Sequence, residues 1–223
     1  KSRSRGLGDV YKRQVLGDTD TAIDAGVGAI NVDGAVGAGV GVQLGALEDA
    51  SFDTGFSADI NFNVADDAGD IATALAGDNT ALDNAEGLVV TSGNTDMVGA
   101  ADIQSSDAYD AAASSYTISD SAGAVLADTD TIVNDGVSGV VVTDATGAGF
   151  VDAADGVSLT DLEGSLQVAT GDSAADINFR VEDSASAIAS ELAGDNTALD
   201  NANDLVVDGG DTDMVGAANI QSS

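Results

Sequence analysis

The chain has 223 residues, a formal net charge of −33 and only 4% aromatic residues, with no Pro, Cys, His or Trp. Without His and Cys it lacks the usual general base and any thiolate nucleophile or metal ligand. So acidic a chain excludes nucleic acids and anionic membranes as default partners, because binding phosphate groups requires Lys and Arg.

Residues 1–14 (KSRSRGLGDVYKRQ) differ sharply in composition from the rest. They contain five of the six basic residues, and from Val15 onward Arg180 alone is basic. Such a break indicates a foreign segment, which is excluded from fold reasoning. The segment resembles a translated sequencing-adapter tail, and a basic targeting arm is the alternative. We therefore expect the native upstream sequence to be missing. No apolar run approaches the roughly 18 residues that a membrane span needs.

Seven short runs of branched and aromatic residues are predicted strands. They are residues 30–32, 60–64, 88–91, 116–119, 140–143, 177–181 and 205–207. The Ala-rich stretches between them are predicted helices. Ile71, Leu75 and Leu82 fall on one helical face, and Ile188, Leu192 and Leu199 repeat that pattern. Asp120 or Ser121 is suited to cap one helix, and Gly77 and Gly194 to end two others.

Most of the chain belongs to one long repeat. Residues 58–64 return as 175–181, and 76–85 return unchanged as 193–202, at a spacing of 117. Upstream, residues 15–21 match 125–131 at a spacing of 110, so a seven-residue difference is predicted in a loop before Ala175. The expected organisation is a first repeat over 15–115, incomplete at its start, and a second over 116–223, cut off at its end. Met97 and Met214 are equivalent and are predicted to pack in the core on a helix face. Tyr116 is predicted to pack at the start of a strand.

Alternation of strand and helix at this spacing predicts parallel strands joined by crossover helices. A unit this small cannot bury its apolar face alone, but a stack of such units can. The predicted fold class is therefore α/β: an elongated repeat solenoid with short parallel strands and Ala-rich helices. The alternative is an all-β fold, either a β-helix or a chain of β-sandwich modules, in which the Gly-rich residues 34–45 form turns.

One segment, residues 116–147, resembles a repeat of very large bacterial surface and secreted proteins of the RTX-adhesin type. The resemblance rests on a "YxIxDSA" pattern and a "VxVTDA" pattern. The residues that match are Tyr116, Ile118, Asp120, Ser121, Ala122, Val140, Val142, Thr143, Asp144 and Ala145. The close match covers about a seventh of the chain. It implies an extracellular repeat protein, of a kind that often also carries calcium-binding nonapeptide modules.

Three pairs of carboxylates lie two residues apart and are the candidate metal ligands: Asp18 with Asp20, Asp128 with Asp130, and Asp211 with Asp213. Calcium requires six to eight converging oxygens, and the sequence contains neither an EF-hand pattern nor the nonapeptide repeat of calcium β-rolls. A hydrated acidic surface with weak, diffuse Ca²⁺ association is favoured, so the metal-site residues stay unknown.

No catalytic or cofactor-binding residue is predicted, and we expect the chain not to be an enzyme. A Ser–His–Asp triad is impossible without His, and the glycines do not form a phosphate-binding loop. The expected function is a structural or adhesive repeat segment, a spacer or matrix component of a large secreted or cell-surface bacterial protein. Its expected partners are neighbouring repeats of the same protein and divalent cations. The alternative function is a calcium-responsive binding module within such a protein.

Overall fold

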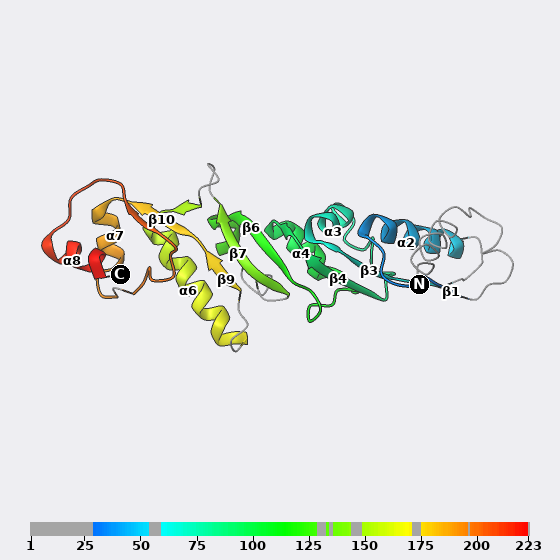
Figure 1. The fold of residues 1–223 in the computed structure, drawn as a ribbon. Coiled ribbons are helices and arrows are strands. Elements are labelled where there is room, and N and C mark those ends of the chain that lie inside the picture. Colours follow the sequence, from blue (N-terminus) through cyan, green and yellow to red (C-terminus); the bar gives the residue numbers. More distant parts are fainter. Residues whose placement is uncertain are drawn as a thin grey trace, which may run out of the picture. The chain divides into compact units, whose positions relative to one another are not determined.

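The computed structural model describes residues 29–53, 59–128, 133, 136–143, 149–170, 175–195 and 197–222. The basic segment 1–14 and the pair Asp18 and Asp20 therefore lie outside the described residues. The chain divides into two compact units. Figure 1 labels their helices and strands. The first contains the described residues up to Gly93 together with Val98–Tyr116. The second contains Asn94–Met97 and the described residues from Thr117 onward.

In the first unit, short parallel strand pairs alternate with helices. The elements are β1 (Ala29–Asn31), α2 (Ala38–Asp53), β2 (Asp59–Asn61), β3 (Asn63–Asp67), α3 (Ala68–Leu75), β4 (Gly87–Ser92) and α4 (Met97–Ser105). The first residue of α4, Met97, is assigned to the second unit. Strand β1 pairs in parallel with β2, and β3 with β4. Helices α2 and α3 pack side by side.

The second unit repeats this scheme with more strands. Its elements are β5 (Asn94–Thr95), β6 (Tyr116–Ser121), α5 (Ala122–Leu126), β7 (Val137–Thr143), β8 (Phe150–Val151), α6 (Ala153–Thr170), β9 (Asp176–Asn178), β10 (Arg180–Asp183), α7 (Ala185–Glu191), β11 (Leu205–Val207) and α8 (Met214–Ser222). The strand order is β5–β6–β7–β9 in one sheet and β11–β10–β8 in the other. Every pairing whose register is described is parallel.

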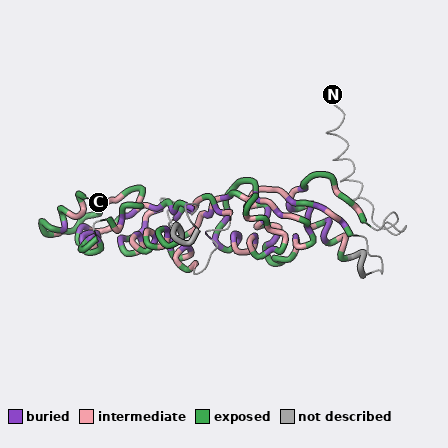
Figure 2. Tube along the Cα trace, turned by 90° about the horizontal axis from the view of Figure 1, so that it is seen from below, coloured by how far each residue is buried: buried purple, intermediate pink, exposed green. Residues whose placement is uncertain are grey.

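The two copies of the repeat have the same core. Phe62 and Val64 are buried in the first copy, and Phe179 and Val181 are buried at the equivalent positions of the second. Figure 2 shows buried residues recurring along the strands and helices of each unit. Helices pack against strands of the same unit: α2 and α3 contact β3, and α6 contacts β9 and β10.

The mixed α/β class and the short parallel strands are confirmed, and all seven predicted strands are present. The all-β alternative is wrong, because the Gly-rich residues 34–45 enter helix α2 at Ala38. Close packing explains this. A Cβ atom on Gly41 would lie 2.7 Å from Cγ2 of Val64, so the helix needs Gly to approach β3.

The predicted helix stops are confirmed. Helix α3 ends at Leu75, and Gly77 follows with φ of 88°. The interpretation of Leu82 as a residue on the same helix face is wrong. It lies in a run of turns held by bonds such as Ala81 N–H to Asp78 O, yet its side chain is fully buried. Leu199 occupies the equivalent turn in the second copy.

The prediction that both methionines pack in the core is right for Met97 and wrong for Met214. Met97 is 7% exposed, whereas Met214 is 90% exposed. The reason lies in the neighbours. The backbone N–H of Met97 donates to Asp120 of β6, and β6 pairs with the β5 strand directly before α4. No strand among the described residues takes that place beside α8.

The seven-residue difference between the copies lies in two places. Ile30 pairs with Ile60 and Val140 with Ile177, which keeps the offset at 110 through the first strand of each copy. Gly41 and Gly156, 115 positions apart, contact equivalent side chains. Five extra residues therefore enter between Thr143 and Gly149. Two more enter between Gly156 and Ala175, where α6 has 18 residues and α2 has 16.

Candidate functional site: aspartates that cap two helices

An aspartate near the end of a strand recurs in the described units and accepts hydrogen bonds from two backbone N–H groups. One N–H belongs to the first residue of an earlier helix, and the other to the residue that follows the aspartate. The three aspartates are Asp66 in β3, Asp120 in β6 and Asp183 in β10. This arrangement is called the double cap below.

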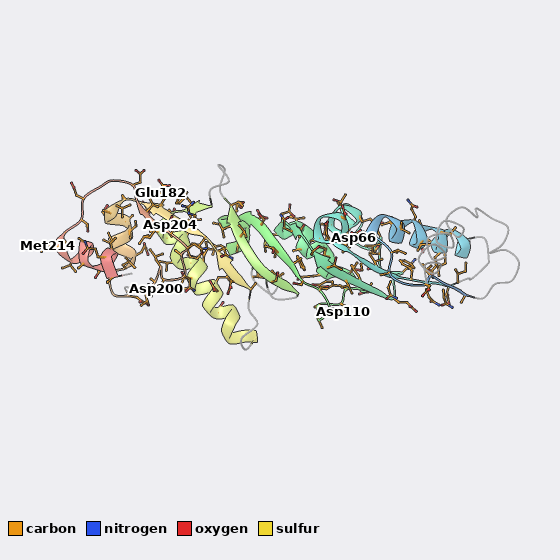
Figure 3. All side chains as sticks on the ribbon, viewed as in Figure 1. Asp66, Asp110, Glu182, Asp200, Asp204 and Met214 are labelled. Carbon is orange, nitrogen blue, oxygen red and sulfur yellow. The ribbon has the colours of Figure 1, made fainter. Side chains whose placement is uncertain are left out.

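The distances are similar in the three cases. Oδ2 of Asp66 accepts from Ala38 N at 2.9 Å, Oδ2 of Asp120 accepts from Met97 N at 3.0 Å, and Oδ2 of Asp183 accepts from Ala153 N at 3.2 Å. In each case Oδ1 accepts from the next residue along the chain, at 2.7 to 3.0 Å. Figure 3 labels Asp66 on the first unit.

The residue after each aspartate caps the helix that follows. Ser121 Oγ accepts from Ala124 N at 3.3 Å and Ser184 Oγ accepts from Ala187 N at 3.3 Å. Asp67 Oδ1 accepts from Asp70 N at 3.1 Å. The expectation of a cap at Asp120 or Ser121 is therefore confirmed for Ser121, while Asp120 caps the preceding helix instead.

The chemistry of the double cap is structural. The first N–H groups of a helix have no partner within the helix and carry the positive end of its dipole. A carboxylate placed there satisfies a donor and interacts favourably with that dipole. Because the acceptor comes from a strand 23 to 30 residues further along the chain, each bond joins two successive strand–helix segments.

The candidate metal pairs do not form clusters in the described part of the chain. Asp130, like Asp18 and Asp20, lies outside it. Oδ2 of Asp128 accepts from Val133 N at 3.2 Å, and Oδ1 of Asp213 accepts from Gly216 N at 2.8 Å, while Asp211 is exposed. Across the described ranges no three acidic side chains lie close enough together to hold a metal ion.

A cluster around Arg180 was not predicted from the sequence. Its guanidinium lies 2.7 Å from Oδ2 of Asp204 and 4.2 Å from the ring centre of Phe150. The cluster borders an open depression lined by Val141, Val142, Thr143, Gly149, Asn178, Phe179, Arg180 and Asn203. In the first copy, the positions of Arg180, Asp204 and Phe150 are occupied by Asn63, Gly87 and Ala35. The sequence feature that could have indicated this cluster is Arg180 itself, the only basic residue after position 14.

Glu48 of α2 and Glu163 of α6 form another equivalent pair. Burial raises the pKa of each carboxyl above its usual range. A backbone hydrogen bond, from Ile60 to Glu48 and from Ile177 to Glu163, has the smaller opposite effect and lowers the pKa. Glu163 is only 7% exposed. The equivalence follows from the offset of 115, which sequence comparison alone did not detect.

Comparison of the chain with protein-family models, curated proteins and solved structures found no match to any of them. Within the described residues, no helix is both long enough and apolar enough to cross a lipid bilayer.

Proposed function

We propose that the chain is a structural repeat segment, an elongated solenoid that acts as a spacer or matrix component of a large secreted or cell-surface bacterial protein. The observation that supports this most is the double cap. Three times, a carboxylate joins the strand of one segment to the helix of the segment before it. The acidic side chains thereby hold together a repeated backbone.

The strand order supports a stacked architecture. Strands that are neighbours in a sheet follow each other in the chain, with two exceptions. Strand β7 pairs with β9, and β8 pairs with β10. The pairing is parallel and each connection carries a helix or a run of turns. Repeats built this way contact mainly their nearest neighbours, which is the property of a solenoid.

The secreted or surface location, and any adhesive role, rest on the resemblance of residues 116–147 to repeats of large exoproteins and on the acidic composition. A strongly acidic surface keeps a repeat protein soluble and keeps neighbouring chains apart. Neighbouring repeats of the same protein are the proposed partners.

Small-angle X-ray scattering of the full chain tests the proposed architecture. A compact domain of this length has a radius of gyration of about 17 Å. A solenoid gives a clearly larger value together with a pair-distance distribution that has a long tail, measured at high enough salt to screen repulsion between charges. A radius close to the compact value, with a symmetric distribution, contradicts the proposal.

A further inference from the structure

Among the described strands, β11 lies at the edge of its sheet. On one side, β11 is bonded to β10: Val181 N donates to Asp204 O and Asp208 N donates to Asp183 O, each at 2.8 Å. In a parallel ladder this pattern directs the N–H and C=O groups of Leu205 and Val207 toward the opposite edge. The described residues place no strand there.

In the first copy the same edge is filled. Leu88 N donates to Ala108 O at 2.7 Å, and Asp110 N donates back to Leu88 O at 2.9 Å. Further along, Ser115 N donates to Val90 O at 2.9 Å. Residues 108–115 thus follow the edge of β4, and the chain then continues into β6.

The apolar side chains around this edge show the consequence. In the first copy Leu88, Val90, Met97, Ala100 and Ile103 are all buried. Their equivalents in the second copy lie 117 positions later and are more accessible. Val207 is 43% exposed and Met214 is 90% exposed. Ala217 is exposed, and Leu205 and Ile220 are half-buried. These five residues define the β11–α8 face.

We propose that the β11–α8 face binds a segment with the sequence of residues 107–126. The occupant is identified by the first copy, where residues 108–115 bond to the edge of β4, β6 pairs with β5, and Asp120 accepts from Met97 N. In the bound state its backbone extends the sheet at Leu205 and Val207. The equivalent of Asp120 accepts from Met214 N, and the equivalent of Tyr116 accepts from Gln221, as it does from Gln104 in the first copy. The proposal does not depend on secretion or adhesion.

Charge sets the conditions under which binding is measured. The segment carries Asp107, Asp110 and Asp120, and the chain has a net charge of −33, so the two repel at low salt. Screening shortens the range of this repulsion to about 8 Å near physiological ionic strength. The affinity is therefore expected to rise with NaCl concentration, opposite to binding driven by ion pairs.

The experiment is a titration of the full chain into a fluorescein-labelled peptide of residues 107–126, followed by fluorescence anisotropy at about 0.2 M NaCl. Saturable binding with a stoichiometry of one is expected. Met214→Asp on the chain is expected to weaken binding at least about tenfold. Val215→Asp is the matched control. Val215 is 68% exposed and its equivalent Val98 stays 69% exposed in the filled copy, so this side chain lies outside the contact. Circular dichroism checks that both variants fold.

A peptide with Tyr116→Ala and Ile118→Ala should lose binding, because both side chains are buried in the first copy. No saturation up to about 1 mM peptide, or equal weakening by Met214→Asp and Val215→Asp, overturns the proposal. Concentration-dependent self-association of the chain, abolished by Met214→Asp but not competed by the peptide, overturns the assignment of the occupant and indicates a second whole chain.

A second measurement does not depend on any destabilising variant. Residues 107–126 are appended directly after Ser223, as Asp107 directly follows Ser106 in the first copy. The appended segment is expected to slow hydrogen exchange at the amides of Leu205 and Val207 and to abolish binding of the added peptide. Unchanged exchange at both amides, compared with a scrambled extension of the same composition, counts against the proposal.

Discussion

Two glycines in equivalent helices show how single residues determine the packing of this chain. A Cβ atom on Gly41 or Gly156 would lie 2.7 Å from Cγ2 of Val64 or Val181 and 3.0 Å from Cδ2 of Leu82 or Leu199. The four side chains concerned are buried, and Val has a stiff χ1 angle. Each helix therefore approaches its strand only because the contact position lacks a side chain.

The substitution Gly156→Ala is expected to destabilise the protein, because the added methyl group overpacks the contact with Val181, at a cost of about 1 to 3 kcal/mol. Gly164→Ala in the same helix is the control. Nothing lies within 4 Å of a Cβ atom there, so the better helix propensity of Ala should stabilise the protein by up to about 1 kcal/mol. Urea unfolding measures both, and equal signs for the two variants contradict the packing argument.

The buried Glu163 predicts a dependence of stability on pH. Burial raises the pKa of its carboxyl in the folded protein above that of the unfolded chain. Its contribution to stability is therefore fully present below the unfolded pKa and is lost as the pH rises through the folded pKa.

We expect Glu163→Gln to raise the melting temperature at pH 7 by a few degrees, since about 1 kcal/mol corresponds to roughly 2 to 4 °C in a protein of this size. The difference from the parent chain should vanish near pH 4, where the parent carboxyl is itself protonated. The exposed Glu191 provides the control, because Glu191→Gln removes the same charge without relieving burial. If both variants shift the melting temperature equally, net charge and not burial is responsible.

The double cap connects the elements of successive segments. Removal of its carboxylate leaves two backbone N–H groups without their acceptor, one at the start of a helix and one beside the aspartate. Asp183, for example, accepts from Ala153 N at 3.2 Å and from Ser184 N at 2.7 Å. Loss of a helix cap costs about 0.5 to 2 kcal/mol.

The substitution Asp183→Ala is accordingly expected to lower the free energy of unfolding by about 1 to 2 kcal/mol. Asp161→Ala removes an equally charged side chain from an exposed position of α6 and should change stability by less than about 0.5 kcal/mol. Hydrogen exchange at the first turn of α6 should accelerate in the first variant alone. Parallel behaviour of the two variants would falsify the role of the double cap.

Residue patterns predicted the elements well where the signal was local. The strands follow from runs of branched residues such as those at Val140, and Ser121 and Gly77 mark helix ends through their own side chain or backbone. Helices α2 and α6 could not be predicted in this way. Their Gly content argues against helix, and the packing of Gly41 on Val64 becomes visible only in three dimensions.

The candidate site was predictable only in part for the same reason. Asp120 and Ser121 stand out locally as capping residues, but the partner of Asp120 is Met97, which lies 23 residues upstream. The exposure of Met214 also escaped prediction, because equivalence by repeat says nothing about which strand lies alongside. Contacts between distant segments determine both features.

At the scale of the whole molecule, the charge of −33 predicts how the protein responds to ions. Repulsion among carboxylates opposes the compact state, and salt screens it. The melting temperature should therefore rise equally in millimolar CaCl₂ and MgCl₂. A rise specific to Ca²⁺, beyond a control matched for ionic strength, would support the calcium-responsive alternative.

The direction of the double cap has a consequence for the order of folding during synthesis. Helix α2 receives its acceptor from Asp66, which is 28 residues closer to the C-terminus, and α6 receives its acceptor from Asp183, 30 residues further on. A chain that emerges from a ribosome with its N-terminus first can complete the start of each helix only after the next strand has appeared. Folding therefore trails synthesis by about one strand–helix segment, and each new segment completes the one before it.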